Sequence, residues 1–279
     1  MKPTPPVPPS AQPPKAVKML DLTPRTAKVP VPRIVYYAVE GFGKTTFASF
    51  APNPIILAAR DEKGVQRLLD AGQINPLPMI DVATWPDLLE ALDALATHQH
   101  DRKTIILDSL GAYERLCHEE VTRRDFRGDP GDGGFLGFGR GPKVALTEWT
   151  RLLQKLDVLN QKGMMIILLG HSYVEKFKNP TGADFDRFAC KLDPLAWSMI
   201  KGWADCVWFG NFLTVTSANK NPNAKAKGVG GTDRVVYTQR RDSHDAKPGY
   251  NMPAEIFLGE DPAKVWNELT DHIFQQRSQ

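Results

Sequence analysis

The chain has 279 residues, of which 42% are hydrophobic and 24% charged, and its formal net charge is +3 at pH 7. These values predict a soluble protein with one large core or two modest ones, and they exclude fibrous and wholly disordered classes. No run approaches the roughly 18 apolar residues of a membrane-spanning helix, and the N-terminus lacks the apolar core of a secretory signal. We therefore expect a cytoplasmic protein whose three scattered cysteines are reduced.

The first part of the chain differs from the rest in composition. Residues 1–33 hold six Lys or Arg against the single acid Asp21, and they contain ten of the 23 prolines. Because proline cannot continue a helix or a ladder, we expect residues 1–32 to form a disordered, basic tail. The tail is either a solvated leader or a tether for nucleic acid or a partner protein. A single domain is expected over residues 33–279.

Beyond the tail, apolar runs alternate with helical patterns. Strands are predicted at residues 34–38, 54–59, 104–108 and 164–170, and helices at 45–50, 87–96, 114–121 and 143–160. Strands separated by helices predict a mainly parallel α/β sheet with helices on both faces. After residue 205, short strands at 206–213, 234–239 and 255–258 precede a closing helix at 261–274. We expect these strands to extend the same sheet in antiparallel fashion.

A phosphate-binding loop is predicted at residues 38–45, AVEGFGKT, between the first strand and its helix. Its small residues let backbone N–H groups surround a phosphate, while Lys44 meets the β and γ phosphates and the Thr45 hydroxyl holds Mg²⁺. Ala38 replaces the usual first glycine, which is tolerated where the backbone φ is negative. The predicted ATP-binding residues are Glu40, Gly41, Phe42, Gly43, Lys44, Thr45 and Thr46.

Three further side chains are expected at the same edge of the sheet. Asp108 ends a buried strand and is the second candidate Mg²⁺ ligand, or alternatively a helix cap. Glu62 follows the strand 54–59 and is the candidate base that activates water; Glu40 is a second carboxylate in range, and an ordinary solvated acid is the other interpretation. His171 ends the strand 164–170, where it either contacts the γ-phosphate or is a structural histidine.

Together these segments resemble a known family. The loop Glu40 to Thr46, the strand ends Asp108-Ser109 and Gly170-His171, and the later Asp245-Ala246-Lys247 resemble the RecA-like P-loop ATPase core. The resemblance is greatest to phage-encoded nucleotide-binding ATPases related to single-strand-annealing recombinases, and it covers roughly residues 33 to 260. It implies a RecA-like fold in which the strand bearing His171 lies between the phosphate-loop strand and the strand bearing Asp108.

The resemblance also implies roles for individual residues. Lys44, Thr45, Asp108, Glu62 and His171 keep the functions given above, with Mg²⁺ and ATP as cofactors. Lys247 is implied to reach the nucleotide of a neighbouring subunit as a trans-acting cation, in a homo-oligomeric ring or filament. Because Pro248-Gly249 follows it, a solvated lysine is the alternative.

Two segments have the composition of single-stranded DNA-binding loops, which the resemblance also implies. Residues 122–143 combine seven glycines with cations and rings, so we expect them to be mobile and not to pack a core. The segment after His171 repeats this chemistry. A flexible lid and packing beneath a helix at 194–204 are the respective alternatives. The candidate DNA-binding residues are Arg123, Arg124, Arg127, Phe135, Phe138, Arg140, Lys143, Tyr173, Lys176, Phe177, Lys178 and Arg187. A third basic patch, at 220–231, is expected to be an exposed turn.

The sequence therefore predicts an ATP-dependent, single-stranded-DNA-binding ATPase of phage recombination or replication, acting in the host cytoplasm with other phage replication proteins. An ATP-gated adaptor or helicase loader is one alternative. A P-loop kinase acting on a small molecule or nucleotide is the other, since the same loop serves phosphoryl transfer to many acceptors.

Overall fold

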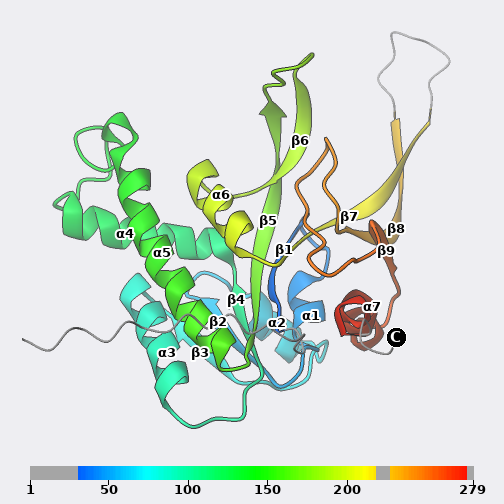
Figure 1. Ribbon diagram of the computed structural model, residues 1–279, viewed down its shortest axis with the longest axis horizontal. Coiled ribbons are helices and arrows are strands. Elements are labelled where there is room, and N and C mark those ends of the chain that lie inside the picture. The colour runs from blue at the N-terminus through cyan, green and yellow to red at the C-terminus, as the bar shows by residue number, and fades with distance from the viewer. Residues whose placement is uncertain (1–30, 218–226, 275–279) are drawn as a thin grey trace, which may run out of the picture.

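The structure, a computed structural model, describes residues 31–217 and 227–274. A nine-stranded mixed sheet forms its centre, and eight of the strands follow the order β3-β2-β4-β5-β1-β7-β8-β9 (Figure 1). The strands are β1 (Arg33–Ala38), β2 (Pro54–Ala59), β3 (Met79–Val82), β4 (Thr104–Asp108), β5 (Met165–Phe177), β6 (Phe185–Cys190), β7 (Cys206–Ser217), β8 (Lys227–Tyr237) and β9 (Glu255–Leu258). The ninth strand, β6, pairs with the outer half of β5.

The helices lie on both faces of this sheet, in two groups (Figure 1). They are α1 (Lys44–Ala48), α2 (Gly64–Asp70), α3 (Trp85–Thr97), α4 (Leu110–Asp125), α5 (Arg140–Gln161), α6 (Pro194–Trp203) and α7 (Pro262–Phe274), with a 3₁₀ turn at Gly137–Gly139. α3, α4, α5 and α6 share one buried cluster with alternate residues of the strands, and α1, α2 and α7 share the other. Among the described residues, no helix is both long enough and apolar enough to span a membrane.

Successive side chains of the central strands point to opposite faces of the sheet, which explains why there is a buried core on each face. In β1, Val35 and Tyr37 belong to the cluster under α5, whereas Ile34 and Tyr36 belong to the cluster under α1. Every residue of β1 after Arg33 is buried, as expected for a strand covered on both faces. The predicted α/β class, with helices on both faces, is therefore confirmed.

The order of the central strands also follows the expectation. β5 pairs in parallel with β1 on one side and with β4 on the other, so the His171 strand lies between the phosphate-loop strand and the Asp108 strand. The predicted antiparallel extension is present, but it begins one strand later than expected, because β7 is parallel to β1 and only β8 and β9 run antiparallel.

Several expected boundaries are corrected by pairings between distant segments. The strand predicted at 164–170 continues as β5 to Phe177, because β6 pairs with it from Ser172 onward. Residues 227–231, expected in an exposed turn, belong to β8, and residues 227–230 pair with β7. The rest of that turn lies outside the described residues, as do residues 1–30 of the predicted tail. Val31 and Pro32, the last two tail residues, instead accept hydrogen bonds from Asn160 and Ile166.

Candidate nucleotide site

The chain turns from β1 into α1 through a tight loop at the carboxyl edge of the sheet. Gly41 and Gly43 have φ values of 71° and 97°, which only glycine adopts at little cost. α1 begins directly afterwards, and the first N–H groups of a helix have no acceptor within it. The loop therefore offers backbone donors at the edge of the sheet, which is the arrangement that binds phosphate. Ala38 lies in β1 with strand geometry, so its methyl group is tolerated as expected.

The ring of Phe42 fixes the loop from behind. Phe42 is fully buried, and its ring meets Tyr36, Phe47 and Phe212 edge-on at centroid distances of 5.8–6.1 Å. On β7, Gly210 leaves room for the ring, since a Cβ there would lie 2.6 Å from it. Phe42 is one of the predicted nucleotide-binding residues, but its side chain points into the core. Only its backbone remains available to a phosphate.

Lys44 holds a charge in a confined position above the loop. The residue is 7% exposed, and its Nζ lies 3.4 Å from the carbonyl oxygens of Ala38 and Val39. Burial lowers the pKa of Lys44, while the carboxylate of Asp108, among others, opposes the shift. An ammonium with two weak carbonyl contacts is prepared to exchange them for phosphate oxygens.

Thr45 and Asp108 meet across the site. The Thr45 hydroxyl donates a 2.7 Å hydrogen bond to Oδ2 of Asp108. Burial raises the pKa of Asp108 to about 6, with the Thr45 hydrogen bond opposing the shift. A hydroxyl and a carboxylate are hard oxygen ligands, and Mg²⁺ bound to nucleotides takes only one or two such protein groups. The pair fits a magnesium ion, and within the described residues no cluster of three His, Cys, Asp or Glu offers a more complete protein site.

Glu62 and His171 complete the edge. Glu62 Oε1 accepts a 2.7 Å hydrogen bond from Ser109, the residue after Asp108. His171 is the register partner of Ala38, one strand over, and its buried Nδ1 has no partner among the described residues. Burial and the nearby Lys44 lower the pKa of His171, so its imidazole is neutral at pH 7.

These predicted residues line one pocket. It has a volume of about 640 Å³ and extends from the phosphate loop to α2, an element that the sequence analysis missed. Gly64, Arg67, Leu68 and Gln73 form the α2 side. A second pocket of about 560 Å³ shares Glu62 and His171 and adds Glu40, Glu114 and Lys191. Burial raises the pKa of Glu114 to about 7.

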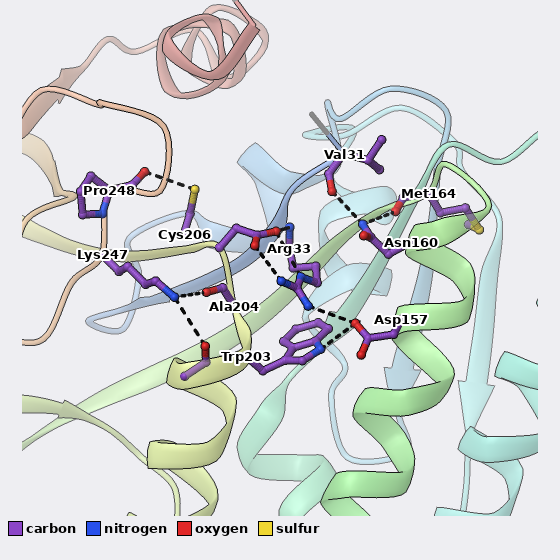
Figure 2. A network of polar contacts seen from close by, with 12 residues as sticks. Val31, Arg33, Asp157, Asn160, Met164, Trp203, Ala204, Cys206, Lys247 and Pro248 are labelled. Carbon is purple, nitrogen blue, oxygen red and sulfur yellow. Dashed lines mark hydrogen bonds and ion pairs between the residues drawn. The ribbon is translucent and has the colours of Figure 1, made fainter. Parts of the chain in front are cut away.

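Lys247 is not brought to this site. Its backbone pairs with Val207, and its ammonium donates to the carbonyl oxygens of Ala204 and Gly202. Figure 2 shows Lys247 near Cys206 and Arg33, the first residues of β7 and β1, whereas the phosphate loop follows the last residue of β1. A trans role across a subunit contact stays a prediction.

The two predicted DNA-facing segments are more ordered than expected. The expectation that residues 122–143 cannot pack a core is wrong, because Phe135 is 5% exposed and packs against Phe126. Arg124 donates to the buried Glu148, whose other oxygen accepts from Trp85. Residues up to Asp125 lie in α4, and those from Arg140 lie in α5. Phe138, by contrast, is 97% exposed.

The segment after His171 is a β-hairpin that projects beyond the body of the sheet (Figure 1). Arg187 on β6 is 8% exposed and forms a 2.8 Å ion pair with Asp245, which also accepts from Lys201. Phe177 packs between Phe185 and the Arg187 guanidinium. The Lys176 side chain is 71% exposed, with Asp184 at 3.9 Å. Arg187, a candidate DNA-binding residue, is therefore held in a buried ion pair, whereas Lys176 and Lys178 are exposed.

A glycine-bearing loop between strand and helix, with an acid on the parallel strand next but one and the His171 strand between them, defines a P-loop nucleotide-binding protein of the RecA-like type. A family model described as an AAA domain matches residues 31–249, and the chain belongs to that family. It is therefore an AAA-type P-loop ATPase domain.

Solved structures with similar folds are distant in sequence. The flagellar accessory protein FlaH from Methanocaldococcus jannaschii matches with 11% identity and a TM-score of 0.39, covering 82% of this chain and 85% of FlaH. An ATPase from the type III secretion system of pathogenic bacteria matches with 12% identity and a TM-score of 0.36, covering 64% of this chain and 50% of that protein. No curated protein matches the chain.

Proposed function

We propose that this domain hydrolyses ATP while bound to single-stranded DNA, and that it serves phage recombination or replication. The observation that carries the proposal is the course of β5. Its first half lies in the central sheet, His171 lies beside the phosphate loop, and the same strand then runs without a break into the projecting hairpin. A change at the nucleotide is thereby connected, through one rigid element, to a hairpin that carries the exposed cations Lys176 and Lys178.

In this proposal the described side chains divide the hydrolytic work. Lys44 binds the terminal phosphates and offsets the charge that develops on them. Glu62, held by Ser109, orients the attacking water and accepts its proton. Thr45 and Asp108 hold Mg²⁺, which supplies further neutralisation of phosphate charge. The neutral His171, whose Nδ1 has no partner in the described part of the chain, detects the γ-phosphate.

The proposed DNA surface is smaller than the composition alone indicated. Phe135 is buried and contributes to it only as the floor of a groove, whereas Arg124 and Arg187 have structural contacts and are left out of it. Phe177 is left out for the same reason, because its ring packs within the hairpin. The remaining cations and rings are Arg123, Arg127, Arg140, Lys143, Tyr173, Lys176, Lys178 and Phe138. Cations meet phosphates there, and exposed rings stack on unpaired bases.

We further propose that the protein assembles as a homo-oligomer on the strand, in the cytoplasm, with other phage replication or recombination proteins as partners. A trans-acting cation would then complete the site at the contact between copies. The phosphate pocket shares Glu62 and His171 with the pocket that contains Glu40 and Glu114, and a cation from a neighbour would lie next to those carboxylates.

The test is ATP turnover by the full chain, titrated with single-stranded DNA, duplex DNA and RNA, while particle mass is followed by light scattering. We expect single-stranded DNA to raise turnover and mass together. Turnover that ignores every polymer and rises only with a protein partner would instead identify an adaptor or loader.

A kinase is a second candidate, because the pocket of about 560 Å³ next to Glu62 and His171 is large enough for a small acceptor. ATP consumption that ignores DNA and depends on a small molecule, with a phosphorylated product, would favour it.

A further inference from the structure

A groove on α4 has a fixed aromatic floor. The floor is Phe135, whose ring lies 4.8 Å from the imidazole of His118 and 5.7 Å from Phe126. Gly141, at the start of α5, packs so closely that a Cβ there would lie 2.4 Å from the Phe135 ring. The ring is therefore held from behind, and the small part of it that stays exposed lines the groove.

The groove has the size and chemistry of a site for a flat, partly polar ring. Its volume is about 590 Å³, and its lining is mainly apolar, with Phe135, Leu136 and Pro130. His118 and Thr122, one turn apart on α4, add polar groups. Burial lowers the pKa of His118, so its neutral imidazole provides one donor and one acceptor at pH 7. A nucleobase matches this set, because it has apolar faces and a hydrogen-bonding edge.

Two positively charged side chains at the rim of the groove are available to bind phosphate. Arg115 and Arg123 line it, with side chains 55% and 70% exposed. Their ion pairs, with Asp61 and Glu120, lie on the surface, where such pairs stabilise little and are readily exchanged. The one acid in the lining, Glu119, is held by two hydrogen bonds from Arg60, which offsets its charge.

We propose that this groove holds one unstacked base of a bound single strand, with the adjoining phosphates at Arg115 and Arg123. The proposal rests on the proposed function and deepens it, since it assigns the aromatic side of α4 to a base. Phe138, exposed on the same segment, receives a neighbouring base outside the groove.

The experiment compares two strands of about 15 nucleotides, an oligothymidylate and the same sugar-phosphate chain without bases, by fluorescence anisotropy with the full protein. The native protein should bind the base-bearing strand more tightly. Thr122→Trp fills the groove from α4 without changing its charge. The Thr122→Trp variant should bind oligothymidylate about tenfold more weakly, because it loses roughly one stacked base. Its affinity for the abasic strand should be unchanged.

Thr150→Trp is the matched control, because Thr150 is an exposed threonine on α5 that does not line the groove. It should leave both affinities as they are. Equal affinity of the native protein for the two strands, or an unchanged preference in Thr122→Trp, overturns the base site while leaving DNA binding intact. Failure to bind either strand overturns the proposed DNA function itself, and the base site with it. Loss of a dimer in Thr122→Trp would assign the groove to a second copy of the chain.

Discussion

The phosphate loop and the two segments proposed to bind DNA are built on different principles. The loop depends on a short stretch of chain whose ends are fixed by β1 and α1, and its glycines and Lys44 take the positions that their order requires. The other two segments depend on partners far away, such as Asp245 for Arg187 and Glu148 for Arg124. A local motif therefore specifies chemistry, whereas composition alone does not tell a free cation from a structural one.

The largest expected effect tests the loop. Lys44→Ala should lower ATP turnover at least a hundredfold, because it removes the cation nearest the terminal phosphates. The thermal unfolding midpoint should not fall, since a buried ammonium is costly to desolvate and leaves with the substitution. Turnover is measured by phosphate release, and a rate like that of the native protein would contradict the assigned site.

The next effect separates the structural cation of the hairpin from the exposed one. Arg187→Ala should lower the free energy of unfolding by about 3 kcal/mol, because Asp245 loses one of its two ion pairs in a largely buried position. Lys176→Ala is the control and should change stability by less than about 0.5 kcal/mol. Urea denaturation measures both. Equal stabilities of the two variants would mean that the Arg187–Asp245 pair does not hold the hairpin.

The pH dependence of stability tests how His244 packs against the base of the β5–β6 hairpin. The His244 ring packs against both Phe209 and Tyr237, and its segment pairs with Phe188 of β6. Burial, then Arg241, lowers the pKa of His244 to about 4. Below its unfolded pKa of about 6.5 the unfolded chain takes up a proton that the folded chain refuses, so stability falls as pH drops from about 6.5 toward 4.

We expect this loss to be about 1–2 kcal/mol. His244→Gln should flatten the profile in urea denaturation series at several pH values. The same slope in the variant would assign the acid sensitivity to other groups.

The smallest effect concerns exposed charge. The binding constant for single-stranded DNA falls as salt rises, and the slope of its logarithm against the logarithm of salt concentration counts the neutralised phosphates. Lys176→Gln together with Lys178→Gln should make this slope shallower by about 1.4, if each lysine neutralises one phosphate. Binding isotherms at several salt concentrations measure the slope. Retention of the full slope would place the contacts outside the hairpin tip.

Much of the fold was predictable because its signals are local. Buried runs such as Ile34 to Ala38 and Thr104 to Asp108 identify central strands, and both are found there. The missed elements are short or weakly patterned: α2 has only Val65 fully buried, and β3 has four residues. β6 was missed because Asp186 and Arg187 interrupt its apolar residues, and only its pairing with β5 makes it a strand.

The candidate site follows the same division. Thr45 and Asp108 were expected to meet and do so, since the ends of parallel strands share an edge. The contribution of α2 to the pocket was not foreseen, because it depends on how the helix packs after Glu62. The burial of Phe135 was also missed, since seven glycines in its segment indicate mobility until close packing, as at Gly141, is seen.

The phosphate-loop motif depends on a residue far from it in the sequence, because the Phe42 ring fits only if position 210 has no side chain. Alanine there would push against the Phe42 ring and against the Ala38 methyl group, only 2.9 Å away. A homologue that retains every letter of the loop but has a bulkier residue at this position would have to seat its phenylalanine elsewhere. A search that scores only the eight-residue motif would count such a chain as able to bind nucleotide. The residue at position 210, on β7, would show that its loop cannot pack in the same way.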